Sequence, residues 1–400
     1  MLRRPQRGDT DLTAARRRGA RAGLPTKLAF LLLGSALLAA AGCSGPRPGA
    51  GSGTGAPPPD EHVLYIYNWV DFIGKSTIAN FERETGIRVV YDTFDADSTL
   101  EAKLMAGDSG YDVVATALDY YSRQIKAGAY EKLDRSRLTN WHFLDPQLLK
   151  TVEVGDPGNQ YAMPYLNSLN GFIYNEDMIR ERMPNAPRDS LRMIFDPAVV
   201  SKFADCGVSL LDSAEDVIQL ALAYLGRDPN SHDAGDLHDA EQLVVAIRPY
   251  VRTFDSSEFL STVTSGEMCL VMAWSSDYST AKARAKAAGR DINLRFTVPK
   301  EGSNFSVTSL LIPAGAPHRE AAHKFLNYIL RPEVIAEVTN DTHYSNPNLA
   351  ATRYVNPAIL NDPAMYPTPE VMKRTYTANE ASVEFERVRT RIWTRIKTNH

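Results

Sequence analysis

The amino-acid sequence predicts an α/β protein with two lobes, each built on a mostly parallel sheet flanked by helices. From Val63 onward, strand and helix patterns alternate in the order strand-helix-strand-helix-strand, which is typical of parallel sheets with helices on both faces. A second alternating region begins near Leu166. The chain has 400 residues, more than a single hydrophobic core usually serves, so two globular units are expected.

The first alternating region starts with the strand pattern VLYIYNW at Val63. A helix follows, with Ser76 as its N-cap and Gly86 just past its end. Next come a strand, a helix that stops at Gly107 and another strand, with the sequences IRVVYDTF, STLEAKLMAG and YDVVATA. Because ligands of such sheets bind beyond the carboxyl ends of the strands, residues at those ends are candidates for a binding site.

Aromatic and acidic residues occupy these strand ends, namely Trp69, Asp71, Asp119 and Tyr120. Rings next to carboxylates suit a cationic ligand. Asp119 also has a purely structural interpretation, as the N-cap of a helix with the sequence YYSRQIKAG. The sequence alone leaves both interpretations of Asp119 open.

The second region contains the strand patterns NGFIYN, CGVSLL and MCLVMAW and the helix pattern EDVIQLALAYLG. The C-terminal part is predicted to be helical. Its segment HREAAHKFLNYILRPEVIAEV has an apolar helical stripe that Pro332 interrupts. The last helix, near VEFERVRTRIWTRIK, is expected to pack on the second lobe.

The first 60 residues have the composition of a targeting segment and a linker. Basic residues precede the apolar run LAFLLLGSALLAAAG, which is too short to span a membrane, so residues 1–42 are predicted to be a signal peptide. LLAAAGCSG resembles a bacterial lipobox and predicts a lipid anchor on Cys43, although Ala39 and Ala41 would also suit an ordinary signal peptidase. Residues 43–61, rich in Gly, Ser and Pro, are expected to form the anchor and a flexible linker.

The charge of the remaining chain argues against a nucleic-acid partner. The first 60 residues hold nine of the 44 basic and three of the 48 acidic residues, so 35 basic and 45 acidic residues remain and the net charge is about −10. Binding to nucleic-acid phosphates needs a basic surface. A cationic ligand is compatible with this balance, although many soluble proteins are acidic.

Motifs of common enzyme classes are absent from the sequence. It contains no G-x-S-x-G, no H-E-x-x-H, no Walker A loop and no G-x-G-x-x-G after the first strand. The compact cluster of His232, Asp233, His238 and Asp239 falls in a polar loop, where a solvated turn is preferred to a metal site. We therefore predict no catalytic residue, no metal and no cofactor.

Pairs of aromatic and acidic residues occur in both halves of the chain, Trp69 with Asp71 and Trp274 with Asp277. Such a pair alone is more often a core ring beside a helix-capping carboxylate. An alkylammonium ion, however, needs flat apolar faces for its methylenes and a carboxylate for its charge. One pair in each half favours a site for an organic amine between the lobes.

Ten stretches between about residue 62 and the C-terminus carry a family resemblance. They are YIYNWVDFI, IANFERETGIRVVYDTFDAD, LEAKLMAGDSGYDVV, AMPYLNSLNGFIYN, FADCGVSLLDS, YLGRDPNS, MAWSSDY, FTVPKEGSNF, KFLNYILRPEV and RVRTRIWTRIK. Together they closely resemble the bacterial periplasmic putrescine/spermidine-binding proteins of polyamine ABC transporters, in their putrescine-binding branch.

This resemblance implies a type II periplasmic-binding-protein clamshell. Lobe 1 would comprise residues 62–166 plus 302–348, and lobe 2 residues 167–301 plus 349–400. The protein would capture a polyamine or another organic amine and deliver it to the permease subunits of an ABC importer. It would lie in the bacterial envelope, periplasmic and anchored to the membrane by lipid. An amine sensor that docks on a receptor, or a hydrolase of amine conjugates, are the alternatives.

The resemblance also implies ligand-binding residues, each at a position of this sequence that matches the family. Those that match the family's aromatic walls and carboxylates in type are Trp69, Asp71, Trp274, Asp277 and Tyr344. Phe72 stands where the family has Tyr, and Asp216 where it has Glu, with Glu215 adjacent. The resemblance also implies a disulfide between Cys206 and Cys269, which composition alone leaves open against two buried thiols.

Other positions depart from the family. Val70 and Ala117 replace serines, Ser306 replaces an aromatic wall, and Thr308 replaces an acid that grips one ammonium group. Asp119 adds a carboxylate that the family lacks. Loss of one acid from a desolvated ammonium site weakens binding unless another takes its place. The preferred amine therefore stays open between putrescine, spermidine, agmatine and a ligand with one cationic end.

Overall fold

The computed structural model describes residues 62–94, 97–107, 109–256 and 258–398. The chain divides into two units, 1–56 and 57–400, and the structure described below belongs to the second unit. The predicted signal peptide, Cys43 and the linker lie outside the described residues. None of the helices in the described ranges is long and apolar enough to cross a membrane.

Lobe 1 is built on three parallel strands. β1 (Val63–Trp69) pairs with both β2 (Arg88–Phe94) and β3 (Val113–Ala117). The crossovers are α1 (Thr77–Thr85) and α2 (Asp97–Met105), so the predicted alternation of strands and helices is confirmed.

The capping residues of α1 and α3 can be compared with those predicted from the sequence. Ser76 precedes α1, and Gly86 ends it with φ 72°, a left-handed conformation that glycine adopts without steric strain. The interpretation of Asp119 as an N-cap is wrong, because α3 (Leu118–Lys126) starts directly after β3 and Ala117 is its N-cap. Asp119 lies instead in the first helical turn.

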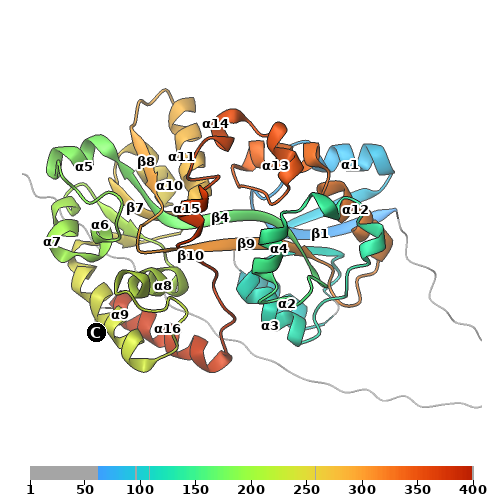
Figure 1. Ribbon diagram of the computed structural model, residues 1–400, viewed down its shortest axis with the longest axis horizontal. Helices are drawn as coiled ribbons and strands as arrows, with labels where there is room; N and C mark the ends of the chain where they lie inside the picture. Colours follow the sequence, from blue (N-terminus) through green and yellow to red (C-terminus); the bar gives the residue numbers. More distant parts are fainter. Residues whose placement is uncertain (1–61, 95–96, 108, 257, 399–400) are drawn as a thin grey trace, which may run out of the picture. The chain divides into compact units, whose positions relative to one another are not determined.

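Lobe 2 repeats the parallel arrangement. β5 (Val208–Leu210) lies between β6 (Thr253–Phe254) and β7 (Leu270–Trp274), and both pairings are parallel. The main helices of this lobe are α5 (Glu176–Arg182), α6 (Arg192–Phe195), α7 (Pro197–Val200), α8 (Ala214–Tyr224), α9 (Ala234–Ile247), α10 (Phe259–Ser265) and α11 (Ser275–Ala287). In Figure 1 they surround one end of the long strand β4.

Two long antiparallel strands join the lobes. β4 (Ala162–Asn175) pairs through its first half with β9 (Ser303–Leu311) and through its second half with β7 and β8 (Leu294–Thr297). Both strands run across the middle of the folded unit in Figure 1. The strand order β2-β1-β3-β9-β4-β7-β5-β6 therefore crosses from lobe 1 to lobe 2 without interruption, with β10 (Thr375–Tyr376) beside β9. We call β4 and β9 the hinge strands.

The C-terminal helices agree with the predicted pattern. α12 (Arg319–Ile329) ends before Pro332, which is the first residue of α13 (Pro332–Thr342), where its missing N–H removes no helical bond. α16 (Val383–Thr398) packs on α8 and α9, as expected for the last helix. The remaining helices are α4 (Pro146–Val152), α14 (Pro357–Leu360) and α15 (Pro369–Met372).

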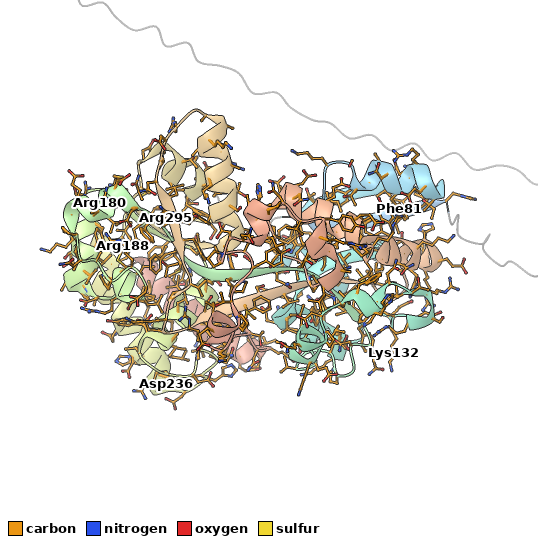
Figure 2. All side chains as sticks on the ribbon, turned by 45° about the horizontal axis from the view of Figure 1, so that its top comes forward. Phe81, Lys132, Arg180, Arg188, Asp236 and Arg295 are labelled. Atoms are coloured by element: carbon orange, nitrogen blue, oxygen red, sulfur yellow. A yellow bond between two sulfur atoms is a disulfide. The ribbon has the colours of Figure 1, made fainter. Side chains whose placement is uncertain are left out.

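Three hydrophobic clusters fill the unit. Two cover opposite faces of the lobe 1 sheet, since Val113 and Ala115 face one cluster while Val114 faces the other. The third is the core of lobe 2. Charged side chains such as those of Lys132 and Arg180 project from the outer surfaces of the lobes (Figure 2).

The exact lobe boundaries stay a prediction. Packing favours one change to them, a later end for lobe 1. Beyond residue 348, apolar side chains still join the cluster that includes β1 and α12, namely Ala351, Val355, Ile359 and Met365.

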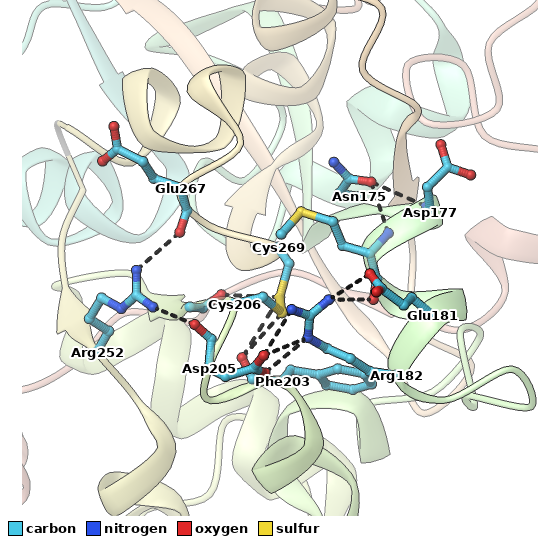
Figure 3. Close-up of a disulfide and its surroundings, with 12 residues drawn as sticks. Asn175, Asp177, Glu181, Arg182, Phe203, Asp205, Cys206, Arg252, Glu267 and Cys269 are labelled. Atoms are coloured by element: carbon cyan, nitrogen blue, oxygen red, sulfur yellow. Dashed lines mark hydrogen bonds and ion pairs between the residues drawn. A yellow bond between two sulfur atoms is a disulfide. The ribbon is translucent and has the colours of Figure 1, made fainter.

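A disulfide joins Cys206 and Cys269, which confirms the predicted pair. Both cysteines are buried, and each lies just before a strand of lobe 2, β5 or β7. Arg252 donates to the carbonyl oxygens of Asp205 at 3.1 Å and Glu267 at 3.0 Å, so it bridges the same two segments (Figure 3).

We predict that replacing both cysteines, Cys206→Ala with Cys269→Ala, lowers the free energy of unfolding by about 2 to 4 kcal/mol, because the unfolded chain loses a constraint. Denaturant unfolding of the unit 57–400, which lacks Cys43, measures this difference. A thiol titration of the same unreduced unit should find no free thiol, and two free thiols would contradict the pairing.

Candidate ligand-binding cleft

The floor of the cleft is one face of the hinge strands. Leu166 lies opposite Thr308, and Ser168 opposite Ser306, in the antiparallel register. Because side chains alternate along a strand, these residues share a face, and Asn304 extends the same face toward lobe 2. All five line the cleft.

The cleft has a volume of about 590 Å³ and is lined from both lobes. It brings together nearly all of the residues predicted to bind the ligand: Trp69, Phe72, Asp119, Tyr120, Asp216, Trp274, Asp277, Thr308 and Tyr344. Among the described residues, the side chains along its wall include six carboxylic acids and no Lys, Arg or His. The arrangement suits a cationic ligand with apolar parts.

Asp71 is the predicted residue that this cleft does not include. Its side chain is exposed and its φ is 60°, in the left-handed region that non-glycine residues rarely adopt. It lies close enough to Tyr344 to influence that side chain electrostatically. A binding role for Asp71 stays a prediction.

Aromatic rings form the lobe 1 wall. The Phe72 ring lies 4.3 Å from the Tyr344 ring and 6.1 Å from the Trp69 ring, measured between centroids. Phe94, which the sequence analysis did not single out, packs 4.7 Å from Trp69 and also lines the cleft. It ends β2, so the strand-end rule would have found it. Trp274 faces this wall from the end of β7 in lobe 2.

Asp277 both caps a helix and faces the cleft. Its carboxylate accepts a hydrogen bond of 3.0 Å from the backbone N–H of Trp274, at the start of α11. Burial raises the pKa of Asp277 to about 6, and the bond from Trp274 partly opposes the rise. The Asp277 carboxylate therefore caps α11 and also lines the cleft, while its role in ligand binding stays a prediction.

Asp216 lies in the first turn of α8. The side-chain amide of Asn170 on β4 donates to its carboxylate at 2.9 Å, which ties the acid to a hinge strand. Burial raises the pKa of Asp216 to about 7, and the nearby Glu215 carboxylate adds to the rise.

Three more acids gather beside Asp216: Asp97, Asp119 and Glu215. Burial raises the pKa of Asp97 to about 7, although the Thr116 hydroxyl donates to it at 2.8 Å. Burial and the charges of Glu215 and Asp97 raise the pKa of Asp119 well above its usual value. Asp97 was not predicted, because helix α2 was expected to begin at Ser98 and the acid before it was not considered.

The family departures all lie at this cleft. Val70, Ala117, Ser306 and Thr308 line it, and Ala117 is the direct register partner of Thr308 between β3 and β9. The added Asp119 follows Ala117 by two residues. The position of the predicted loss, Thr308, and that of the predicted gain, Asp119, therefore line the same cleft, and their effect on binding stays a prediction.

The predicted polar loop around His232 is wrong in part, because His238 and Asp239 lie inside α9. Asp233 is the N-cap of this helix, and the His232 ring stacks on Phe385 with centroids 3.7 Å apart. Within the part of the chain that the structure describes, no group of three or more His, Cys, Asp or Glu is placed to hold a metal ion.

A family model described as bacterial extracellular solute-binding protein matches residues 76–367. The chain belongs to this family. Membership confirms that the protein binds a solute and is not an enzyme, and that it is a periplasmic binding protein.

Two similar proteins are named as putrescine-binding proteins. The putrescine-binding periplasmic protein SpuD of Pseudomonas aeruginosa is 43% identical over 340 residues, which cover 85% of this chain and 93% of SpuD. The putrescine-binding periplasmic protein PotF of Escherichia coli is 41% identical over 341 residues, covering 85% and 92%. The resemblance to the putrescine-binding branch is confirmed.

A solved structure supports the fold. The spermidine/putrescine ABC transporter substrate-binding protein PotD of Streptococcus pneumoniae matches with a TM-score of 0.73 and 25% identity, over 84% of this chain and 98% of that chain. The predicted fold class is thereby confirmed.

We predict that the ligand-free protein becomes less stable as pH rises from about 5 to 8. The folded-state pKa of Asp216 lies above its unfolded value, so its contribution is present at low pH and is lost as pH rises through about 7. The change should be on the order of 2 kcal/mol for this group. Unfolding free energies at several pH values measure it.

Asp216→Asn keeps an oxygen for the Asn170 amide and should flatten this pH dependence. Asp291→Asn, at an exposed acid outside the cleft, is the matched control. An unchanged slope in Asp216→Asn would contradict the assignment.

Proposed function

We propose that this protein is the substrate-binding component of a polyamine ABC importer, which captures a putrescine-like amine between its lobes and delivers it to the permease. SpuD and PotF are named putrescine-binding proteins, and the chain is similar to both over most of its length. The observation that carries the proposal is the composition of the cleft. Aromatic walls from both lobes lie beside carboxylates, and no basic side chain occurs among the lining residues that the structure describes.

Each feature of a polyamine has a partner in this cleft. The methylene groups would lie against the rings of Trp69, Phe72 and Trp274, which cover them with apolar surface. The ammonium groups would donate to Asp277 at one end and to Asp216 at the other. A bound cation also relieves the repulsion among the buried acids.

Capture would be linked to movement of the lobes. Trp69, Phe72 and Asp119 belong to lobe 1, and Asp216 and Trp274 belong to lobe 2, so a ligand in the cleft would contact both lobes. The hinge strands are the direct sheet connection between the lobes. A ligand that binds both sides favours the closed arrangement, which the permease would recognise.

We predict that Trp274→Ala and Asp277→Ala each weaken amine binding by at least about tenfold, since each removes a desolvated contact worth roughly 1.4 kcal/mol or more. Isothermal titration calorimetry with putrescine measures the effect.

Asp277→Asn separates the charge from the helix cap, because the amide oxygen can still accept from Trp274 N–H. Asp291→Asn is the surface control. If both Trp274→Ala and Asp277→Ala fold and bind putrescine as tightly as the wild type, the proposed binding site is wrong.

We also propose that Cys43 carries a lipid anchor, on the strength of the LLAAAGCSG sequence. Cys43→Ala should abolish labelling by a radioactive fatty acid and release the protein from the membrane fraction. Equal labelling of wild type and variant would contradict the anchor. Labelling of the wild-type protein is the positive control for this assay.

A further inference from the structure

Helix α3 of lobe 1 carries a stripe of polar side chains that begins at the ligand cleft. Asp119, Ser122 and Lys126 are separated by three and four residues, so they lie on the same face of this helix. Asp119 lines the cleft, while Ser122 and Lys126 line a second cavity, of about 370 Å³. This second cavity is lined from both lobes, so the stripe on α3 continues beyond the ligand along the gap between them.

On the lobe 2 side, the second cavity is lined by the segment between β10 and α16. The side-chain amide of Asn230 fastens this segment to lobe 2, because it donates to the carbonyl oxygen of Thr377 at 3.0 Å and accepts from the backbone N–H of Asn379 at 2.9 Å. Ala378 is buried and lines both the cleft and the second cavity, and Glu380 lines the second cavity. The segment therefore belongs to lobe 2 and faces α3.

Glu380 bridges the two lobes. Its carboxylate accepts a hydrogen bond of 3.0 Å from the Ser122 hydroxyl and forms an ion pair with the Lys126 ammonium group. Burial alone would raise the pKa of Glu380, but the bonds from Lys126 and Ser122 outweigh it and hold the pKa below its usual value. The Glu380 side chain is 27% exposed and that of Lys126 69%, so solvent screens the ion pair and the bond from Ser122 adds to it.

We infer that Glu380 is a positioning residue for ligand capture, a latch that ties lobe 2 to helix α3 and slows release of the amine. This inference rests on the proposed function and adds a bond that holds the lobes together apart from the ligand. Both contacts of the Glu380 carboxylate join different lobes, so they break when the lobes separate. A ligand enclosed between the lobes can leave only after such a separation.

The latch and the cleft share their supports. On lobe 1, helix α3 connects Asp119 in the cleft to Ser122 and Lys126 at the latch within about two turns. On lobe 2, Ala378 at the cleft is two residues from Glu380. Ligand and latch therefore stabilise the same arrangement of the lobes, and each is expected to favour the other.

Stopped-flow kinetics with putrescine on the purified mature protein test the latch, with the fluorescence of Trp69 and Trp274 at the cleft as the signal. We expect Glu380→Ala to raise the dissociation rate constant by about three- to tenfold, since it removes a partly exposed ion pair and one hydrogen bond to a charged group. The association rate constant should change by less than about twofold, because the latch forms only after the ligand has met the separated lobes.

An exchange of the two charges separates a latch from a merely structural role. Lys126→Glu and Glu380→Lys should each speed release, whereas the double variant should recover at least about half of the loss, because it re-forms the ion pair across the lobes. Asp189→Ala is the matched control, since it removes an exposed carboxylate whose ion pair with Lys300, at 3.3 Å, stays within lobe 2. An unchanged circular dichroism spectrum shows that each variant folds.

Two outcomes would overturn the inference: a dissociation rate constant in Glu380→Ala equal to that of the wild type, or faster release that the charge exchange does not slow. In both cases putrescine still binds, so the proposed function stands. Absence of putrescine binding by the wild-type protein would instead reject the proposed function, and the inference with it.

Discussion

The side chains of the cleft floor take their positions from the ladder of backbone hydrogen bonds between β4 and β9. In this register Ser168, Ser306 and Thr308 face the cleft, while Val307 and Phe305 face the lobe 1 core. A shift by one residue would exchange the two sets, because side chains alternate along a strand. The buried apolar set on the far face therefore fixes which polar groups the ligand meets.

Two acids of the cleft are held by hydrogen bonds from strand residues. Asp216 is tied to β4 through Asn170, and Asp277 to the end of β7 through the Trp274 backbone. Each acid sits in the first turn of a helix, where the helix dipole favours negative charge. Desolvation still raises the pKa of both, so ionising them in the cleft costs free energy, which a bound cation would offset.

Sequence patterns predicted the parts of the fold with regular local signals. The strands and helices from Val63 to Ala117 follow the periods of strand and helix, and Pro332 marked its helix start. β9 and the first half of β4 were not predicted, because β4 is buried along its whole length and shows no alternation, and Pro164 stands beside a register irregularity. Of the residues that the strand-end rule named, Trp69, Asp119 and Tyr120 line the cleft and Asp71 does not. The strand-end rule could not predict which acids of lobe 1 lie near which acids of lobe 2, because that depends on tertiary packing.

The disulfide lies beside the strands of lobe 2 that lead to the cleft, so the redox state of the two cysteines bears on the cleft. Cys206 and Cys269 fasten the beginnings of β5 and β7, and the continuations of these strands carry Asp216 and the pair of Trp274 and Asp277. In a reducing cytosol the two thiols stay separate, and these segments lack their covalent fastening. This part of lobe 2 is therefore covalently fastened in an oxidising compartment and not in a reducing one.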